Sequence, residues 1–116
     1  MKWNRENDAV IATKIMGRQV RKIYGASPLE VVDILDVTDA DNPRQIDHYS
    51  VDESAAIRAA RQARHIGLCQ AWSLAEGPNG MASLFVRYDG SAVRALAQSA
   101  AQALAMGLVD ITRRPQ

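Results

Sequence analysis

A turn signal between two apolar runs constrains the fold of this chain more than any other feature. The runs cover residues 68–75 and 81–88, and Gly-Pro-Asn-Gly at 77–80 separates them. Pro78 has the fixed φ that suits the second position of a turn, and Gly80 can adopt the positive φ that a tight reversal requires. The two runs are therefore predicted to pair as an antiparallel hairpin.

Three further segments show the spacing of apolar residues that is typical of an amphipathic helix. They are residues 4–16, 54–66 and 91–106, and a glycine follows each of them. Glycine is a common helix end because it adopts positive φ without strain. A short oxygen-bearing side chain can accept the unpaired amides of a first turn, so we expect Asn4 to cap the first helix and Asp52 or Ser50 the second.

The region between the first two predicted helices allows more than one interpretation. The segment RQVRKIY at 18–24 is interpreted as a strand, and LEVVDILDV at 29–37 is apolar enough for a buried strand or a short helix. We expect a second hairpin around Gly-Ala-Ser-Pro at 25–28 and then a loop over 38–45. The predicted order is α-β-β-α-β-β-α in a single domain over residues 1–116. This is an α+β fold with helices packed on a mostly antiparallel sheet.

Charge and cysteine content narrow the possible functions. The chain has 14 basic and 13 acidic side chains and a net charge of +1, so no overall charge attracts it to nucleic acid or to an anionic membrane. Cys69 is the only cysteine, which excludes an intrachain disulfide and a cysteine-based zinc site. The amino-terminal segment lacks the apolar run of a signal peptide, and no apolar stretch reaches the ~18 residues of a membrane span. We therefore expect a cytoplasmic protein that does not cross a membrane.

No set of residues in the sequence forms a catalytic or metal-binding motif. The aspartates of residues 33–41, counted as a calcium loop from Asp39, lack the Gly and Glu that an EF-hand requires. His48 has no second His or Cys with which to form a metal site, and a helix-ending glycine separates His65 from Cys69. The glycines form no phosphate-binding loop. The sequence thus predicts a protein that is not an enzyme and that holds no metal or cofactor.

Two segments carry a resemblance to a known family. NRENDAVIATKIMG at 4–17 is similar to the opening segment of the phage ABA sandwich domain family, and YSVDESAAIRAA at 49–60 is similar to a second segment of that family. The element order and the apolar third helix fit as well. The resemblance implies a small α+β sandwich protein of phage or prophage origin, acting in the host cytoplasm, with no assigned catalytic residues. Such a likeness implies an architecture and a biological setting rather than a reaction.

The second predicted helix carries a basic face opposite its alanines. Arg58, Arg61 and His65 lie on this face, and no acidic residue between 54 and 74 neutralises them. Trp72 offers an aromatic surface on which a base or sugar could stack, and with the three basic residues it forms the predicted ligand-binding set. Two other interpretations remain open: the basic face is an ordinary solvated helix surface, and Trp72 belongs to the core.

Small residues on the third predicted helix indicate an interface between subunits. Opposite its core-facing stripe runs a second row of small or apolar side chains, formed by Ala92, Ala95, Ser99, Ala103 and Met106. Ile57, an apolar residue on the basic face of the second helix, is another candidate for contact with a subunit or element. We therefore expect a homo-oligomer. The alternative is that alanine is abundant there only because it favours helix.

These patterns lead to three hypotheses about function. The leading one is a homo-oligomeric phage accessory protein that binds an anionic small molecule or nucleotide, and so sequesters a host metabolite or signal. The alternative is a protein-interaction module that binds a host or phage protein through an open sheet face around Trp72. Nucleic-acid binding through Arg87 and the tail ITRRPQ is third, because the net charge is close to zero.

Overall fold

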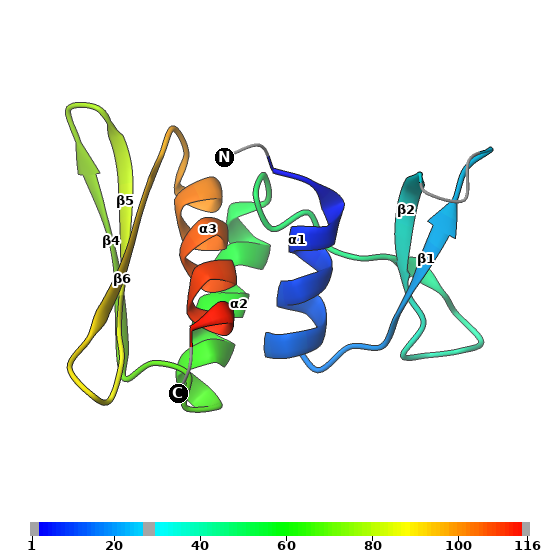
Figure 1. The fold of residues 1–116 in the computed structure, drawn as a ribbon, viewed down its shortest axis with the longest axis horizontal. Helices are drawn as coiled ribbons and strands as arrows, with labels where there is room; N and C mark the ends of the chain where they lie inside the picture. Colours follow the sequence, from blue (N-terminus) through cyan, green and yellow to red (C-terminus); the bar gives the residue numbers. More distant parts are fainter. Residues whose placement is uncertain (1–2, 27–29, 115–116) are drawn as a thin grey trace.

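The computed structural model describes residues 3–26 and 30–114 and shows an α+β fold (Figure 1). Its helical elements are α1 (Arg5–Val10), the π-helical continuation η1 (Ile11–Ile15), α2 (Glu53–His65) and α3 (Ala100–Arg113). Its strands are β1 (Val20–Tyr24), β2 (Val31–Asp36), β3 (Arg44–Gln45), β4 (Ala71–Gly77), β5 (Gly80–Val86) and β6 (Ala92–Ala97). The predicted fold class and order are confirmed, with the strands β3 and β6 added.

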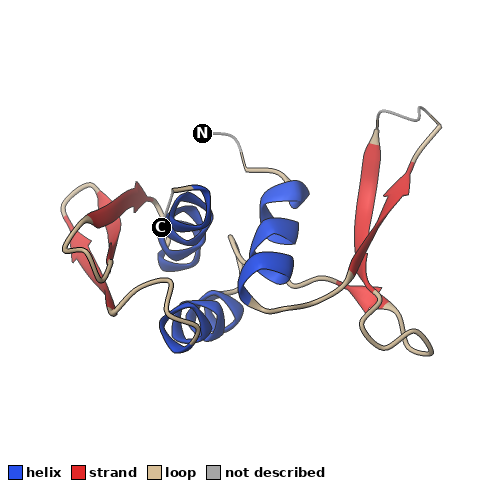
Figure 2. Cartoon of the chain, turned by 60° about the horizontal axis from the view of Figure 1, so that its bottom comes forward, coloured by secondary structure: helices blue, strands red, loops and turns tan. Residues whose placement is uncertain are grey.

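Two antiparallel sheets enclose a layer of helices. One sheet has the order β1-β2-β3 and the other the order β4-β5-β6. The helices α2 and α3 pack beside the β4–β6 sheet, and α1 with η1 lies between them and the β1–β3 sheet (Figure 1, Figure 2). A sheet therefore forms each end of the molecule, and the helices form its middle.

The predicted helix boundaries are confirmed at the start of α1 and at both ends of α2. The side chains of Asn4 and Asp52 each accept a hydrogen bond of 3.1 Å from the backbone amide three residues later. Gly17 and Gly67 have φ values of 67° and 84°. The chain therefore leaves η1 and α2 through a conformation that glycine adopts without strain.

The alanine face of α2 lies at the centre of the core. Its inward side chains, all fully buried, are Ala55, Ala56, Ala59, Ala60 and Ala63. These small side chains let α2 approach α3 and η1, which it contacts. Ile57 is partly buried and packs against this same core, so its apolar contact is made within the chain.

The prediction of one helix over residues 91–106 is wrong. Residues 92–97 form β6, and α3 begins only at Ala100, after Ser99 has capped it by accepting a 3.1 Å hydrogen bond from the amide of Gln102. The segment Ala-Val-Arg-Ala-Leu-Ala fits a two-residue period as well as a helical one, because alanine tolerates both positions. Strand pairing with β5 decides between the two periods.

The predicted interface row therefore does not lie along one helix. Ala92 and Ala95 point to opposite faces of β6, since side chains alternate along a strand. Ser99 is the cap of α3, Ala103 is fully buried within the chain, and Met106 lies on α3. These five residues do not share one surface, so they cannot form the single helical interface that their spacing indicated.

Gly107 is a packing residue inside α3 rather than the end of a helix. A Cβ atom at this position would lie 2.6 Å from Cε2 of Phe85 and 2.9 Å from Oγ of Ser83. The missing side chain lets α3 pass close over β5, where the Ser83 hydroxyl donates a 2.7 Å hydrogen bond to the carbonyl of Ala103. This close approach attaches the β4–β6 sheet to the core.

Both predicted hairpins are present. β4 and β5 pair through to Gly77 and Gly80 around the predicted turn, and β1 pairs with β2 as a second antiparallel hairpin. The structure shows β2 as a strand and places the short β3 in the predicted loop over 38–45. The predicted turn at 25–28 lies partly outside the described residues.

Trp72, Phe85 and Val93 are neighbours across the second sheet, because Phe85 pairs with both of the other two residues. Phe85 and Val93 are fully buried. Trp72 is only partly buried and packs at the margin of the core, on β4 at the edge of the sheet. The two sequence interpretations of Trp72, core residue and accessible aromatic, therefore each describe part of its environment.

Candidate anion-binding site

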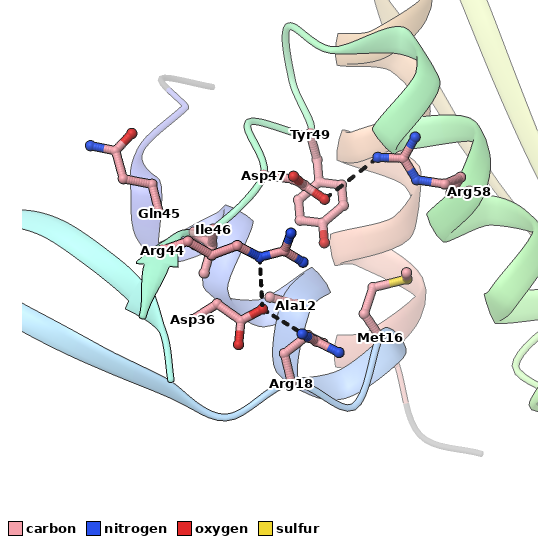
Figure 3. A pocket seen from close by; sticks show the side chains of 10 residues that line it. All are labelled: Ala12, Met16, Arg18, Asp36, Arg44, Gln45, Ile46, Asp47, Tyr49 and Arg58. Atoms are coloured by element: carbon pink, nitrogen blue, oxygen red, sulfur yellow. Dashed lines mark hydrogen bonds and ion pairs between the residues drawn. The ribbon is translucent and has the colours of Figure 1, made fainter. Parts of the chain in front are cut away.

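A polar hollow of about 230 Å³ lies where the β1–β3 sheet meets η1 and α2 (Figure 3). Three arginines reach it from separate segments: Arg18 follows η1, Arg44 belongs to β3, and Arg58 belongs to α2. The other lining residues are Ala12, Met16, Asp36, Gln45, Ile46, Asp47 and Tyr49. We refer to this space as the anion hollow.

Asp36 holds two of the arginines at one side of the anion hollow. Its Oδ2 lies 2.8 Å from Nε of Arg18 and 3.9 Å from Nε of Arg44, and its Oδ1 accepts a 2.9 Å hydrogen bond from the amide of Thr38. Burial raises the pKa of this carboxyl group, but hydrogen bonds from Thr38 and Arg18 outweigh burial and bring the pKa to about 2. Asp36 is therefore ionised at neutral pH and orients both guanidinium groups.

Arg58 stands at the opposite side of the anion hollow. Its NH2 lies 3.6 Å from Oδ2 of Asp47, and both side chains are about half exposed. An exposed ion pair of this length contributes little to stability, on the order of 0–1 kcal/mol. Arg58 can therefore turn from Asp47 to an incoming anion at small cost.

The hydroxyl of Tyr49 points into the anion hollow (Figure 3). Tyr49 is only 2% exposed, and within residues 3–26 and 30–114 its hydroxyl has no hydrogen-bond partner. Burial, together with the nearby carboxylates of Asp47 and Asp8, raises the pKa of this phenol to about 12. The group is therefore a protonated donor whose hydrogen bond no described residue accepts.

A buried clamp fixes the loop that carries Tyr49. Asp8, only 1% exposed, forms a 2.8 Å ion pair with Arg5 and accepts a 3.1 Å hydrogen bond from the amide of Tyr49. Arg5 also donates to the carbonyls of Ile46 and Asp47, at 2.7 and 3.0 Å. Burial raises the pKa of Asp8, and the hydrogen bonds from Arg5 oppose this effect. The loop thus holds its position through polar contacts to α1.

The anion hollow has the chemistry of a binding site for a small anion. Its three arginines exceed its two aspartates by one positive charge. Guanidinium groups present paired donors that match carboxylate and phosphate oxygens, and the hydroxyl of Tyr49 adds a further donor. Among the described residues that line it, none is a Ser, Thr, Cys, His or Lys that could act as a nucleophile or proton acceptor.

The ligand-binding set predicted on α2 does not converge on one place. Arg58 reaches the anion hollow. Arg61 and Trp72 line a second hollow of about 400 Å³ together with Arg64, which is not in the predicted set. His65 is exposed and lines neither hollow. The basic face of α2 is therefore divided between two sites.

Sequence reasoning missed most of the anion hollow, although one signal for it exists. Arg18 precedes β1 and Asp36 ends β2, and the hairpin register pairs Val20 with Asp36. Antiparallel pairing therefore brings the basic start of one strand to the acidic end of the next. Nothing in the local sequence could place Tyr49 there, because a contact with Asp8, far away in the chain, positions it.

Two other residues noted in the sequence lie away from any ligand surface. Cys69 is fully buried, and burial raises the pKa of its thiol, which makes it a poor nucleophile. Arg87, considered above for nucleic-acid binding, is also buried, and residues 111–113 of the basic tail belong to α3.

Comparisons with protein-family models, curated proteins and solved structures found no match to this chain. The resemblance to the phage ABA sandwich family therefore stays a prediction from short motifs. Within residues 3–26 and 30–114, no helix has the length and apolar character needed to cross a membrane. In the same part of the chain, no three His, Cys, Asp or Glu side chains are placed to hold a metal ion.

Proposed function

We propose that this chain is a non-enzymatic binding protein that holds a small phosphate- or carboxylate-bearing molecule in the anion hollow. The observation that carries the proposal is the hydroxyl of Tyr49, a donor that has no acceptor among the described residues and that points among Arg18, Arg44 and Arg58. An anion at this position would accept the hydrogen bond and at the same time balance the excess positive charge.

The volume of the anion hollow favours a compact ligand. At about 230 Å³ it is smaller than the roughly 300–1,000 Å³ of sites for drug-sized molecules. An adjoining hollow of about 300 Å³ shares Arg18, Asp36 and Arg44 with it. A phosphorylated metabolite of a few carbon atoms fits this arrangement, with its phosphate in the anion hollow and the remainder directed to the adjoining space.

The biological setting belongs to the same proposal. The resemblance to the phage ABA sandwich family supports a phage or prophage accessory protein that sequesters an anionic metabolite in the host cytoplasm. The predicted homo-oligomer stays a prediction, and the proposal concerns the site that the residues of this chain form.

Isothermal titration with inorganic phosphate, ribose 5-phosphate and a small dicarboxylate tests the proposal. We expect saturable binding of at least one of them, weakened about tenfold or more by Arg58→Ala, since a charge-assisted hydrogen bond contributes about 1.5–3 kcal/mol. Tyr49→Phe, which removes only the hydroxyl oxygen, should weaken binding by about fivefold. Arg61→Ala is the matched control, because this arginine lies on the same helix but lines the other hollow.

Two outcomes would overturn the proposal. One is that none of the three compounds binds at concentrations up to about 10 mM. The other is that a compound binds but that both Arg58→Ala and Tyr49→Phe leave its affinity unchanged, which would place binding elsewhere. Arg58 is well suited to this test because its exposed side chain can be removed without uncovering a buried carboxylate.

A further inference from the structure

A second hollow, lined by Arg61, Arg64, Ala71 and Trp72, lies between α2 and β4. The two arginines are three residues apart and so share one side of the helix. The turn through Gly67 reverses the chain after α2, so that the first two residues of β4 come beside them. The space has a volume of about 400 Å³. We refer to it as the Trp72 hollow.

The positive charge of the Trp72 hollow is not neutralised locally. In residues 3–26 and 30–114, neither Arg61 nor Arg64 forms an ion pair with a carboxylate, and no acidic side chain lines the hollow. In the anion hollow, by contrast, every arginine lies within 3.9 Å of a carboxylate oxygen. Two adjacent unpaired guanidinium groups favour a phosphate, which can accept hydrogen bonds from both.

Trp72 gives this hollow a second kind of recognition. One part of its side chain packs against the core, and another part borders the hollow at the edge of the sheet. Its indole N–H has no hydrogen-bond partner within the described part of the chain. A fixed aromatic ring beside a cationic group is the arrangement on which nucleobases stack. An inorganic anion would use the arginines but not the ring.

We infer that the Trp72 hollow is a second binding site, which takes a mononucleotide with its base against Trp72 and its phosphate on Arg61 and Arg64. This inference does not depend on the proposed function, because the two hollows share no lining residue. The phosphate supplies the negative charge that neutralises the two arginines, and the base covers the exposed part of the indole. The phosphate alone and the nucleoside alone each satisfy only one half of the site.

Fluorescence of Trp72 tests the inference directly. The chain has two tryptophans, so Trp3→Phe leaves Trp72 as the only one. Titration of this variant with adenosine 5′-monophosphate should quench the emission in a saturable manner. Inorganic phosphate should cause no quenching, and adenosine should quench only at a concentration at least about tenfold higher. The same titration by calorimetry on the unaltered chain makes the test independent of any effect of the Trp3 substitution.

Matched arginine variants locate the binding. We expect Arg61→Ala and Arg64→Ala each to weaken nucleotide binding about tenfold or more, and Arg58→Ala on the same helix to leave it unchanged. The inference is overturned if the nucleotide does not quench Trp72 at about 10 mM, or if inorganic phosphate quenches Trp72 at the same concentration as the nucleotide. Heat from inorganic phosphate without quenching reports on the anion hollow instead. Binding of a single-stranded oligonucleotide without binding of the mononucleotide would also overturn it.

Discussion

The two sheets are attached to the helices by different kinds of interaction. The β4–β6 sheet packs against α3 through fully buried Phe85 and Val93, and Gly107 lets the helix approach closely. The β1–β3 sheet contacts α1 through β2, which places fully buried Ile34 in the same core, and two ion pairs join Asp33 to Arg5 and Lys22 to Glu6. Its hairpin leaves Tyr24 and Val32 more than half exposed. Both sheets thus contribute to the core, and the β1–β3 sheet is joined to α1 by ion pairs as well.

This difference explains where the anion hollow lies. A binding site for an anion needs charged side chains that are held in place but remain able to contact solvent. The tightly packed junction of α3 with β5 excludes such groups, because an unpaired buried charge is costly. The polar junction beside the β1–β3 sheet accommodates Arg18, Arg44 and Arg58 together with their carboxylates. We therefore expect the two junctions to respond differently to substitution.

Truncation of Phe85 should give the largest loss of stability. Phe85→Ala removes a fully buried ring between β5 and α3, and we expect a decrease of about 4 kcal/mol in the free energy of unfolding, measured by urea denaturation. Tyr24→Ala in the other sheet is the matched control, because Tyr24 is 53% exposed, and it should cost no more than about 0.5 kcal/mol. Equal losses in the two variants would contradict the contrast between the sheets.

The sequence predicted those parts of the fold that depend on local chemistry. The caps Asn4 and Asp52, the turn glycine Gly67 and both hairpins follow from short-range rules and are confirmed. The prediction of a helix over 91–106 is wrong because alanine fits both the helical period and the two-residue period of a strand. Pairing with β5 therefore decided the structure of residues 92–97. Local patterns carry no information on which alternative receives tertiary support.

The candidate sites were predictable only in part. Arg58, Arg61 and Trp72 were identified because they stand out on one helix and one strand. They line two different hollows because Arg58 lies beside residues of β2 and β3, whereas Arg61 lies beside β4. The spacing of residues along the helix does not predict which strands pack on each side of it. Tyr49 enters the anion hollow because Asp8 binds its amide, and a contact across 41 residues leaves no local signal.

Loss of Asp8 should have a smaller effect that is specific to the polar junction. Asp8→Ala leaves the indole N–H of Trp3 and the amide of Tyr49 without their acceptor and removes the carboxylate that pairs with Arg5. We expect a decrease of about 3 kcal/mol in the free energy of unfolding, together with weaker anion binding as the Tyr49 loop shifts. Glu6→Ala, which breaks an exposed ion pair on the same helix, should cost less than about 1 kcal/mol. Unchanged anion affinity in Asp8→Ala would show that the clamp does not position the site.

Acid should weaken the polar junction through Asp36. The pKa of this carboxyl group is about 2 in the folded chain, against 3.8 for an unperturbed aspartate, so the folded state binds the proton less readily than the unfolded state. The stabilisation is therefore complete above pH 3.8 and is lost as the pH falls towards 2. Urea denaturation of the unaltered chain and of Asp36→Asn should show a stability difference that shrinks by at most about 2 kcal/mol over this interval. Because every other titrating group is common to the two proteins, a pH-independent difference would mean that Asp36 contributes no such charge-dependent stabilisation, and the contrast between the sheets would then rest on packing alone.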